Sequence, residues 1–180
     1  FKETIRKIKK FSPDLLVIET TTPTFYSDCR FAEVVKRTLS TKIVFVGTHV
    51  SALPEACLRE CEAIDFVARR EFDYTILELA NCLDEGGKLE KVLGISFRKR
   101  KKIIHTRDRP LIEDLDSLPF VSKVYKKFLN IYDYRYALAR YPMIQILSGR
   151  GCPNRCTFCQ YPQVFSGRRF RVRSPENFVY

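Results

Sequence analysis

Three closely spaced cysteines are the residues of this 180-residue chain that are best suited to metal chemistry. Three residues separate Cys152 from Cys156, and two separate Cys156 from Cys159. Thiolates spaced this closely on one loop are typical ligands of iron–sulfur clusters, and a four-iron cluster takes four ligands. The spacing therefore indicates a cluster with three protein ligands and one iron left open to another molecule.

Two alternatives remain for this loop. A structural zinc site takes four Cys or His ligands, but the two histidines, His49 and His105, lie far upstream. Zinc would therefore need a ligand from another cysteine or another chain. In the second alternative the thiols bind nothing, yet a loop that contains Gly149, Gly151 and Pro153 offers no packing reason for three cysteines.

The run Gly-Cys-Pro-Asn-Arg-Cys-Thr-Phe-Cys at 151–159 resembles the cluster loop of radical S-adenosylmethionine (SAM) enzymes. This resemblance implies that Cys152, Cys156 and Cys159 hold a 4Fe–4S cluster, and that the amine and carboxylate of SAM bind the fourth iron. It also implies that Phe158 packs near the adenine of SAM. In this family an electron from the cluster cleaves the sulfonium, and the resulting 5′-deoxyadenosyl radical abstracts a hydrogen atom.

The elements of the first half predict an α/β fold. Apolar, strand-like runs at 15–18, 43–46 and 64–68 alternate with helical patterns at 1–10, 31–39, 54–58 and 74–83. Asp28 is the expected N-cap of the second helix. Continuous apolar strands between helices predict a doubly wound, Rossmann-like parallel sheet covered on both faces. A ligand should then bind beyond the carboxyl ends of the strands.

The remainder of the chain has a different pattern. Residues 94–98 and 103–106 flank a charged turn and predict a β-hairpin. Residues 108–119 contain prolines and acidic side chains, as a surface linker would, and the aromatic-rich residues 125–141 are expected to pack between two domains. An apolar run at 143–147 predicts a strand that leads directly into the cysteine loop.

Residues 46–55 and 64–73 resemble the cobalamin-binding domain that precedes the cluster domain in one branch of radical SAM proteins. Residues 112–119 resemble the interdomain segment of that branch. The family often has glycine where this chain has Thr48 and Arg70. The resemblance implies a fragment of both domains: an N-terminally truncated cobalamin-binding domain at 1–88, a hairpin and linker at 89–141, and the start of a partial (β/α) barrel at 142–180.

By the same resemblance, cobalamin would bind at the carboxyl ends of the predicted strands. The region where some cobalamin proteins place a cobalt-ligating histidine would lie before Phe1. His49 could serve as a cobalt ligand, but a metal-ligating His needs an orienting partner, so a loop histidine hydrogen-bonded near the cofactor, or an exposed one, is the simpler interpretation. The candidate contacts are small or polar residues at these ends: Thr20, Thr21, Thr22, Gly47, Thr48, His49, Ser51 and Glu71. Each of them is equally compatible with an ordinary loop role.

Charge and cysteine usage restrict the partners. The formal net charge is +11, with basic clusters at 6–10, 98–102 and 168–173. Because these clusters fall on separate elements, they predict solvated faces and no nucleic-acid partner, although the third could meet an anionic cofactor or substrate. No apolar run approaches the roughly 20 residues of a membrane span. An odd number of unevenly spaced cysteines argues against a secreted disulfide scaffold and favours the reducing cytoplasm.

These observations predict part of a cobalamin-dependent radical SAM enzyme for methyl transfer or rearrangement at an unreactive carbon. The expected partners are a small-molecule or lipid-like substrate and an electron donor such as a ferredoxin or flavodoxin. One alternative is a radical methylthiotransferase acting on tRNA or protein, which would carry cluster cysteines in its α/β domain. Another is a non-catalytic cobalamin- or metal-binding module. The other four cysteines lack cluster spacing and are expected to be buried structural residues: Cys29, Cys57, Cys61 and Cys82.

Overall fold

A computed structural model describes residues 2–179 of the chain. These residues form two compact units. The first comprises the residues up to Leu111 together with Cys156–Gly167, and the second comprises Ile112–Arg155 together with the residues from Arg168 on. The chain therefore passes from the second unit to the first inside the cysteine loop, and returns after Gly167.

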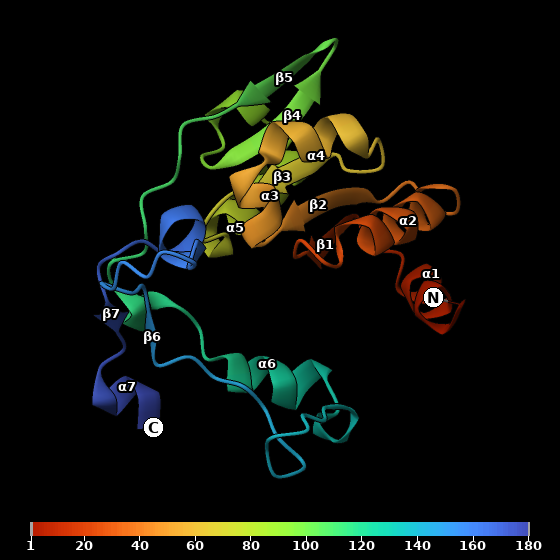
Figure 1. The fold of residues 1–180 in the computed structure, drawn as a ribbon. Coiled ribbons are helices and arrows are strands. Elements are labelled where there is room, and N and C mark those ends of the chain that lie inside the picture. The colour runs from red at the N-terminus through yellow and green to blue at the C-terminus, as the bar shows by residue number, and fades with distance from the viewer. Residues whose placement is uncertain (1, 180) are drawn as a thin grey trace. The chain divides into compact units, whose positions relative to one another are not determined.

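The first unit is built on a five-stranded sheet in the order β1-β2-β3-β4-β5 (Figure 1). The strands β1 (Leu15–Glu19), β2 (Lys42–Val46) and β3 (Phe66–Ala68) pair in parallel. The predicted hairpin is present as β4 (Ile95–Lys99) and β5 (Lys102–His105), and it joins the sheet antiparallel to β3. The predicted α/β, Rossmann-like fold is confirmed, with the hairpin as an integral part of its sheet.

Helices cover both faces of this sheet. Apolar side chains of four helices pack on one face: α1 (Lys2–Phe11), α2 (Phe25–Lys36), α3 (Thr48–Ala52) and α4 (Pro54–Glu60). The helix α5 (Asp73–Asp84) packs on the other. The first residue of the predicted N-terminal helix, Phe1, lies outside the described residues. None of the helices between residues 2 and 179 has the length and apolar character needed to cross a bilayer.

The interior strand β2 shows why the sheet needs both layers. Ile43 and Phe45 belong to the core under α2, whereas Val44 and Val46 belong to the core under α5. All four side chains are almost completely buried. Burial of such a side chain stabilises the fold by about 1.5–3 kcal/mol relative to exposure, so the continuous apolar run fixes a strand with cover on both sides.

The predicted cap of the second helix is wrong. The helix α2 begins at Phe25, and its N-cap is Thr24. Asp28 lies in the first turn, where its carboxylate accepts a hydrogen bond from Thr20 Oγ1 at 2.7 Å. A tertiary partner thus takes the carboxylate that local capping would have used, while its charge still suits a helix amino terminus.

The second unit contains little regular structure. Its strands β6 (Gly149–Arg150) and β7 (Arg171–Val172) form an antiparallel pair, and its helices are α6 (Val121–Phe128) and α7 (Pro175–Val179). Short 3-10 or π turns complete the two units: η1 (Leu89–Lys91), η2 (Leu115–Ser117), η3 (Ile131–Asp133) and η4 (Pro162–Ser166).

The strand predicted at 143–147 is also wrong. Strand structure in this region is limited to Gly149–Arg150, and Ile146 and Leu147 are largely exposed. A strand needs a neighbour to take up its backbone hydrogen bonds. Among the residues that the structure describes, none pairs with 143–147, so an apolar run alone does not make a strand.

Candidate functional site

The loops after the three parallel strands meet at the carboxyl edge of the sheet. The backbone N–H of Thr20, after β1, donates to the carbonyl of Val46 at 2.9 Å. The hydroxyl of Ser51, in α3 after β2, donates to the carbonyl of Gly47 at 2.7 Å. The same oxygen accepts the N–H of Arg70, after β3, at 2.9 Å. Hydrogen bonds therefore join all three loops into one surface where the fold class places ligands.

Gly47 is the tightest point of this edge. Its φ is +108°, and a Cβ at this position would lie 2.5 Å from the backbone oxygen of Thr20. Both the positive φ and the close approach of two backbone segments require glycine. The sequence therefore has glycine here because the first two loops touch at the backbone.

Substituting Gly47 by alanine is expected to lower the free energy of unfolding by about 2 kcal/mol, through backbone strain and steric overlap. Hydrogen exchange of the β1 and β2 amides would measure the loss. Gly86→Ala is the matched control, because Gly86 also has a positive φ (+66°) but no atom within 4 Å of the added Cβ. Equal losses of stability in the two variants would show that the close approach of the Gly47 and Thr20 backbones is not what requires glycine at position 47.

His49 lies against the loop that follows β1. Its Nδ1 is 3.0 Å from Thr22 Oγ1, and its ring centroid is 4.7 Å from that of Phe25. These contacts orient the imidazole from two sides. Because Nδ1 is bonded to Thr22, Nε2 is the ring atom through which His49 could contact a ligand.

The other predicted cofactor residues separate into a buried and an accessible group. Thr20 is 1% exposed and Glu71 is 2% exposed, so both form the frame of the edge. Gly47 is also buried. The side chains open to solvent, at least in part, are Thr21, Thr22, Thr48, His49 and Ser51. A large cofactor at this edge would thus touch the second group.

The cysteine loop carries three free thiols. Cys152 and Cys159 are half-buried and Cys156 is exposed. A turn links the last two, since the N–H of Cys159 donates to the carbonyl of Cys156 at 3.2 Å. Phe158, between them, is 90% exposed. Within residues 2–179, no three His, Cys, Asp or Glu side chains are gathered as a metal-ion site.

The other cysteines have a different environment. Cys29, Cys57 and Cys61 are buried in the core under α2 and α4, and Cys82 is half-buried in α5. Burial raises the pKa of the Cys57 thiol to about 11. Burial and a hydrogen bond with Cys61 raise the pKa of Cys29 as well. Because metal ligation needs the thiolate, Cys29 and Cys57 are poorly suited to bind iron, whereas the three cysteines of the loop are at least partly exposed.

The arginines after the cysteine loop have structural partners within the second unit. Arg168 Nη1 donates to the carbonyl of Asn154, inside the loop, at 2.6 Å. Arg171 Nη1 donates to the carbonyl of Ile112 at 2.6 Å, and Arg173 Nη1 donates to that of Leu118 at 3.1 Å. These arginines of the third basic cluster thus form hydrogen bonds with residues 112–118 and with the cysteine loop. A contact of this cluster with an anionic cofactor or substrate stays a prediction.

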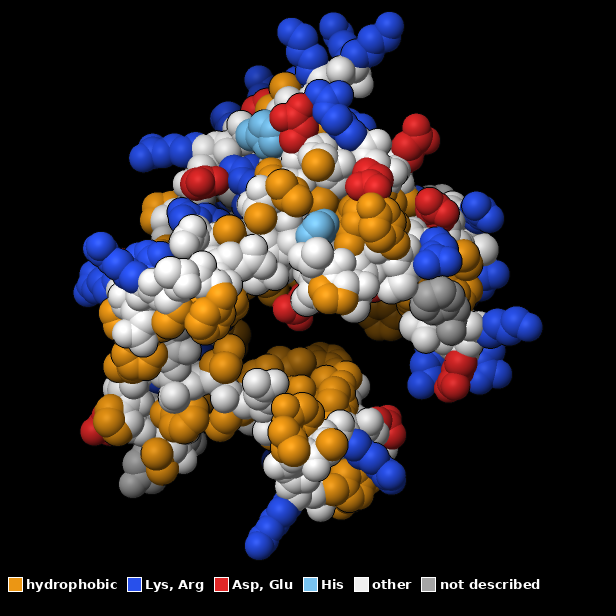
Figure 2. Space-filling view, viewed as in Figure 1, with side chains coloured by type: hydrophobic (Ala, Val, Ile, Leu, Met, Phe, Trp, Pro, Cys, Tyr) orange, Lys and Arg blue, Asp and Glu red, His pale blue; other side chains and the backbone are white. Residues whose placement is uncertain are grey.

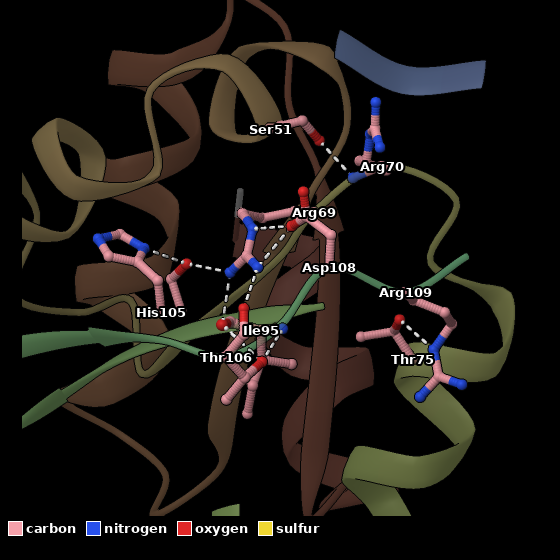
Figure 3. A network of polar contacts seen from close by, with 10 residues as sticks. Ser51, Arg69, Arg70, Thr75, Ile95, His105, Thr106, Asp108 and Arg109 are labelled. Atoms are coloured by element: carbon pink, nitrogen blue, oxygen red, sulfur yellow. Dashed lines mark hydrogen bonds and ion pairs between the residues drawn. The ribbon is translucent and has the colours of Figure 1, made fainter. Parts of the chain in front are cut away.

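Sequence reasoning missed a buried arginine beside the candidate site (Figure 3). Arg69, at the end of β3, donates through Nη1 to the carbonyl of Ile95 at 2.5 Å and to Ser96 Oγ at 2.6 Å. Its Nη2 donates to the carbonyl of Thr106 at 2.6 Å and to Asp108 Oδ1 at 2.7 Å. The available signal was a charged residue directly after an apolar strand. Arg69 fastens the hairpin and the following linker to the parallel part of the sheet.

Comparison with known proteins gave relatives in sequence but no matching family model. The chain is 33% identical over 184 residues to an uncharacterized methyltransferase of Pyrococcus horikoshii, and the match covers 99% of this chain and 38% of that protein. It is 29% identical to the anaerobic magnesium-protoporphyrin IX monomethyl ester cyclase of a Synechocystis species, covering 98% of this chain and 35% of the relative. The chain thus spans little more than a third of the length of either protein.

Solved structures share the fold. The radical SAM methyltransferase TsrM of Kitasatospora setae, with cobalamin and a [4Fe-4S] cluster bound, superposes with a TM-score of 0.71 at 18% identity. That match covers 99% of this chain and 36% of TsrM. The cobalamin-dependent SAM radical enzyme OxsB gives a TM-score of 0.67 at 20% identity, covering 98% of this chain and 24% of OxsB. The predicted resemblance to these cobalamin-dependent radical SAM proteins is thus confirmed for the fold, over nearly the whole chain.

Proposed function

We propose that this chain is part of a cobalamin-dependent radical SAM enzyme. Residues 1–88 would bind cobalamin, 89–141 would connect, and 142–180 would begin the radical SAM barrel. Relatives named as a methyltransferase and as a cyclase support an enzyme. The proposed reaction is methyl transfer or rearrangement at an unreactive carbon of a small-molecule or lipid-like substrate. The proposed site of action is the reducing cytoplasm, which suits seven free cysteines.

The division between accessible and buried thiols carries this proposal. Cys152, Cys156 and Cys159 are free and at least partly exposed on one short loop, while Cys29, Cys57 and Cys61 are buried in the core and the half-buried Cys82 lies apart on α5. The donor set therefore fits a cluster with three thiolate ligands and one open iron. When bound, a 4Fe–4S cluster supplies an electron to the sulfonium of SAM, drawn from a donor such as a ferredoxin or flavodoxin. The exposed ring of Phe158 would pack on the adenine.

The carboxyl edge of the sheet has a tight backbone contact and polar side chains that suit cobalamin. Gly47 lets the backbones of the first two loops approach closely, which holds these loops together at the edge. Hydroxyl groups of Thr21, Thr22 and Thr48 and the imidazole of His49 lie around it. Bound cobalamin would supply a cobalt centre able to carry a methyl group, and these side chains would orient the corrin by hydrogen bonds.

We expect the intact protein, purified without oxygen and incubated with cobalamin, to retain corrinoid absorbance after gel filtration. His49→Ala should weaken corrinoid affinity by roughly fivefold, since one hydrogen bond is worth about 1 kcal/mol. His105→Ala is the matched control, because His105 lies in β5 and bonds to Ser96. Absence of corrinoid binding by the unmodified protein would refute the cobalamin assignment, and bound zinc without iron would favour a metal-binding module.

The exclusion of a nucleic-acid partner stays a prediction. Basic side chains gather at the tip of the β4–β5 hairpin (Figure 2), but part of this cluster has internal partners. The guanidinium of Arg98 donates to the carbonyls of Leu58, Glu62 and Ile64, and Lys99 pairs with Glu90. These contacts support a structural role for the cluster over a binding stripe.

A further inference from the structure

The segment that follows the cysteine loop is docked on the carboxyl edge of the sheet. Within the first unit, η4 packs against α3. The ring of Phe165 lies edge-on to that of Phe72, with centroids 5.9 Å apart, and Pro162 is buried. Aromatic pairs in this geometry attract beyond their burial. The candidate cofactor edge and the residues directly after Cys159 therefore form one packed body.

Arg70 reaches this segment from an unfavourable backbone conformation. Its φ is +61°, in the left-handed region that favours glycine. The hydrogen bond from its N–H to Ser51 Oγ, at 2.9 Å, holds the backbone in place. Its Nη2 lies 3.5 Å from the carbonyl oxygen of Gln163, and Figure 3 shows the side chain extending from the end of β3 toward this segment. Such strain persists where the surroundings enforce it.

We propose that Arg70 is a positioning residue that clamps η4 to the sheet and thereby holds one end of the cluster loop; this role for the loop rests on the proposed function. Consecutive turns transmit the constraint. The N–H groups of Gln163 and Val164 donate to the carbonyl of Gln160 at 2.9 and 3.1 Å, next to Cys159. A distance of 3.5 Å is long for a hydrogen bond, so the guanidinium acts mainly by charge–dipole attraction.

The test compares Arg70→Gly with the unmodified intact protein before metal is added. Glycine accepts a φ of +61° without strain, so the thermal unfolding midpoint should not fall. Hydrogen exchange of the amides at 160–167 should nevertheless become about threefold faster, because an exposed charge contact of this kind is weak. After anaerobic reconstitution, iron release to a chelator should accelerate by a similar factor. Arg70→Lys, which keeps the positive charge, should give intermediate rates.

Arg100→Gly is the matched control. Arg100 also has a positive φ (+54°), but it is exposed in the turn between β4 and β5. This variant should leave exchange at 160–167 unchanged. Unchanged exchange in Arg70→Gly, or equal acceleration in Arg100→Gly, overturns the clamp. If the unmodified protein takes up no iron while Arg70→Gly still exchanges faster, the docking role of Arg70 stands and the proposed function fails.

Discussion

Replacing Cys156 by alanine is expected to abolish the 4Fe–4S cluster of the intact protein. Each of the three thiolates would hold a different iron, so the variant would leave two irons without a protein ligand, and such a cluster should be lost rather than retuned. Cys156 is exposed on its loop, so the substitution removes little packing. Anaerobic reconstitution, with iron and sulfide counted and SAM cleavage assayed, would measure the loss.

Cys61→Ala is the matched control for this experiment. Cys61 is 2% exposed in the core, so its loss should cost on the order of 1 kcal/mol of stability and leave the cluster intact. About four irons per protein in Cys156→Ala, together with normal SAM cleavage, would refute the assignment of Cys156 as a cluster ligand. A cluster lost in Cys61→Ala would do the same, because it would move iron binding into the α/β core.

Local patterns explain why most of the α/β unit could be predicted. The run at 43–46 is apolar on both faces, and it coincides with the strand Lys42–Val46. Pro54 was expected in the first turn of a helix and begins α4. In each case the residues that decide the structure lie within a few positions of one another. Where a distant residue decides, as Thr20 does for Asp28, the local pattern misled.

The residues of the candidate site could be predicted from the sequence, but their arrangement in space could not. Cys152, Cys156 and Cys159 were recognisable because their spacing is a local property of the chain. Their arrangement is not local, since Cys152 belongs to one compact unit and the other two belong to the other. The docking of Phe165 on Phe72 is likewise invisible in sequence, because 92 residues lie between the two rings. Arg70 offered the one hint, as a departure from the glycine of the family.

Arg69 shows how much of this fold depends on a single side chain that no motif marks. Its guanidinium supplies donors to two backbone carbonyls, a serine hydroxyl and a carboxylate, all on the hairpin or just after it. The side chain is only 8% exposed, whereas Asp108 is 56% exposed. Asp108 alone is therefore too exposed to account for the interaction, and the contacts of Arg69 with Ile95, Ser96 and Thr106 contribute as well.

We expect Arg69→Met to lower the free energy of unfolding of the α/β unit by about 3 kcal/mol, because it removes the hydrogen bonds of a buried guanidinium, including those to the Asp108 carboxylate, at nearly unchanged side-chain volume. Hydrogen exchange of the β3 and β4 amides would measure this change. Arg107→Met is the matched control, since Arg107 is exposed and its loss should change stability by less than about 0.5 kcal/mol. A loss below about 1 kcal/mol in Arg69→Met would contradict the prediction, because water would then replace the arginine and the hairpin would be held by its apolar contacts alone.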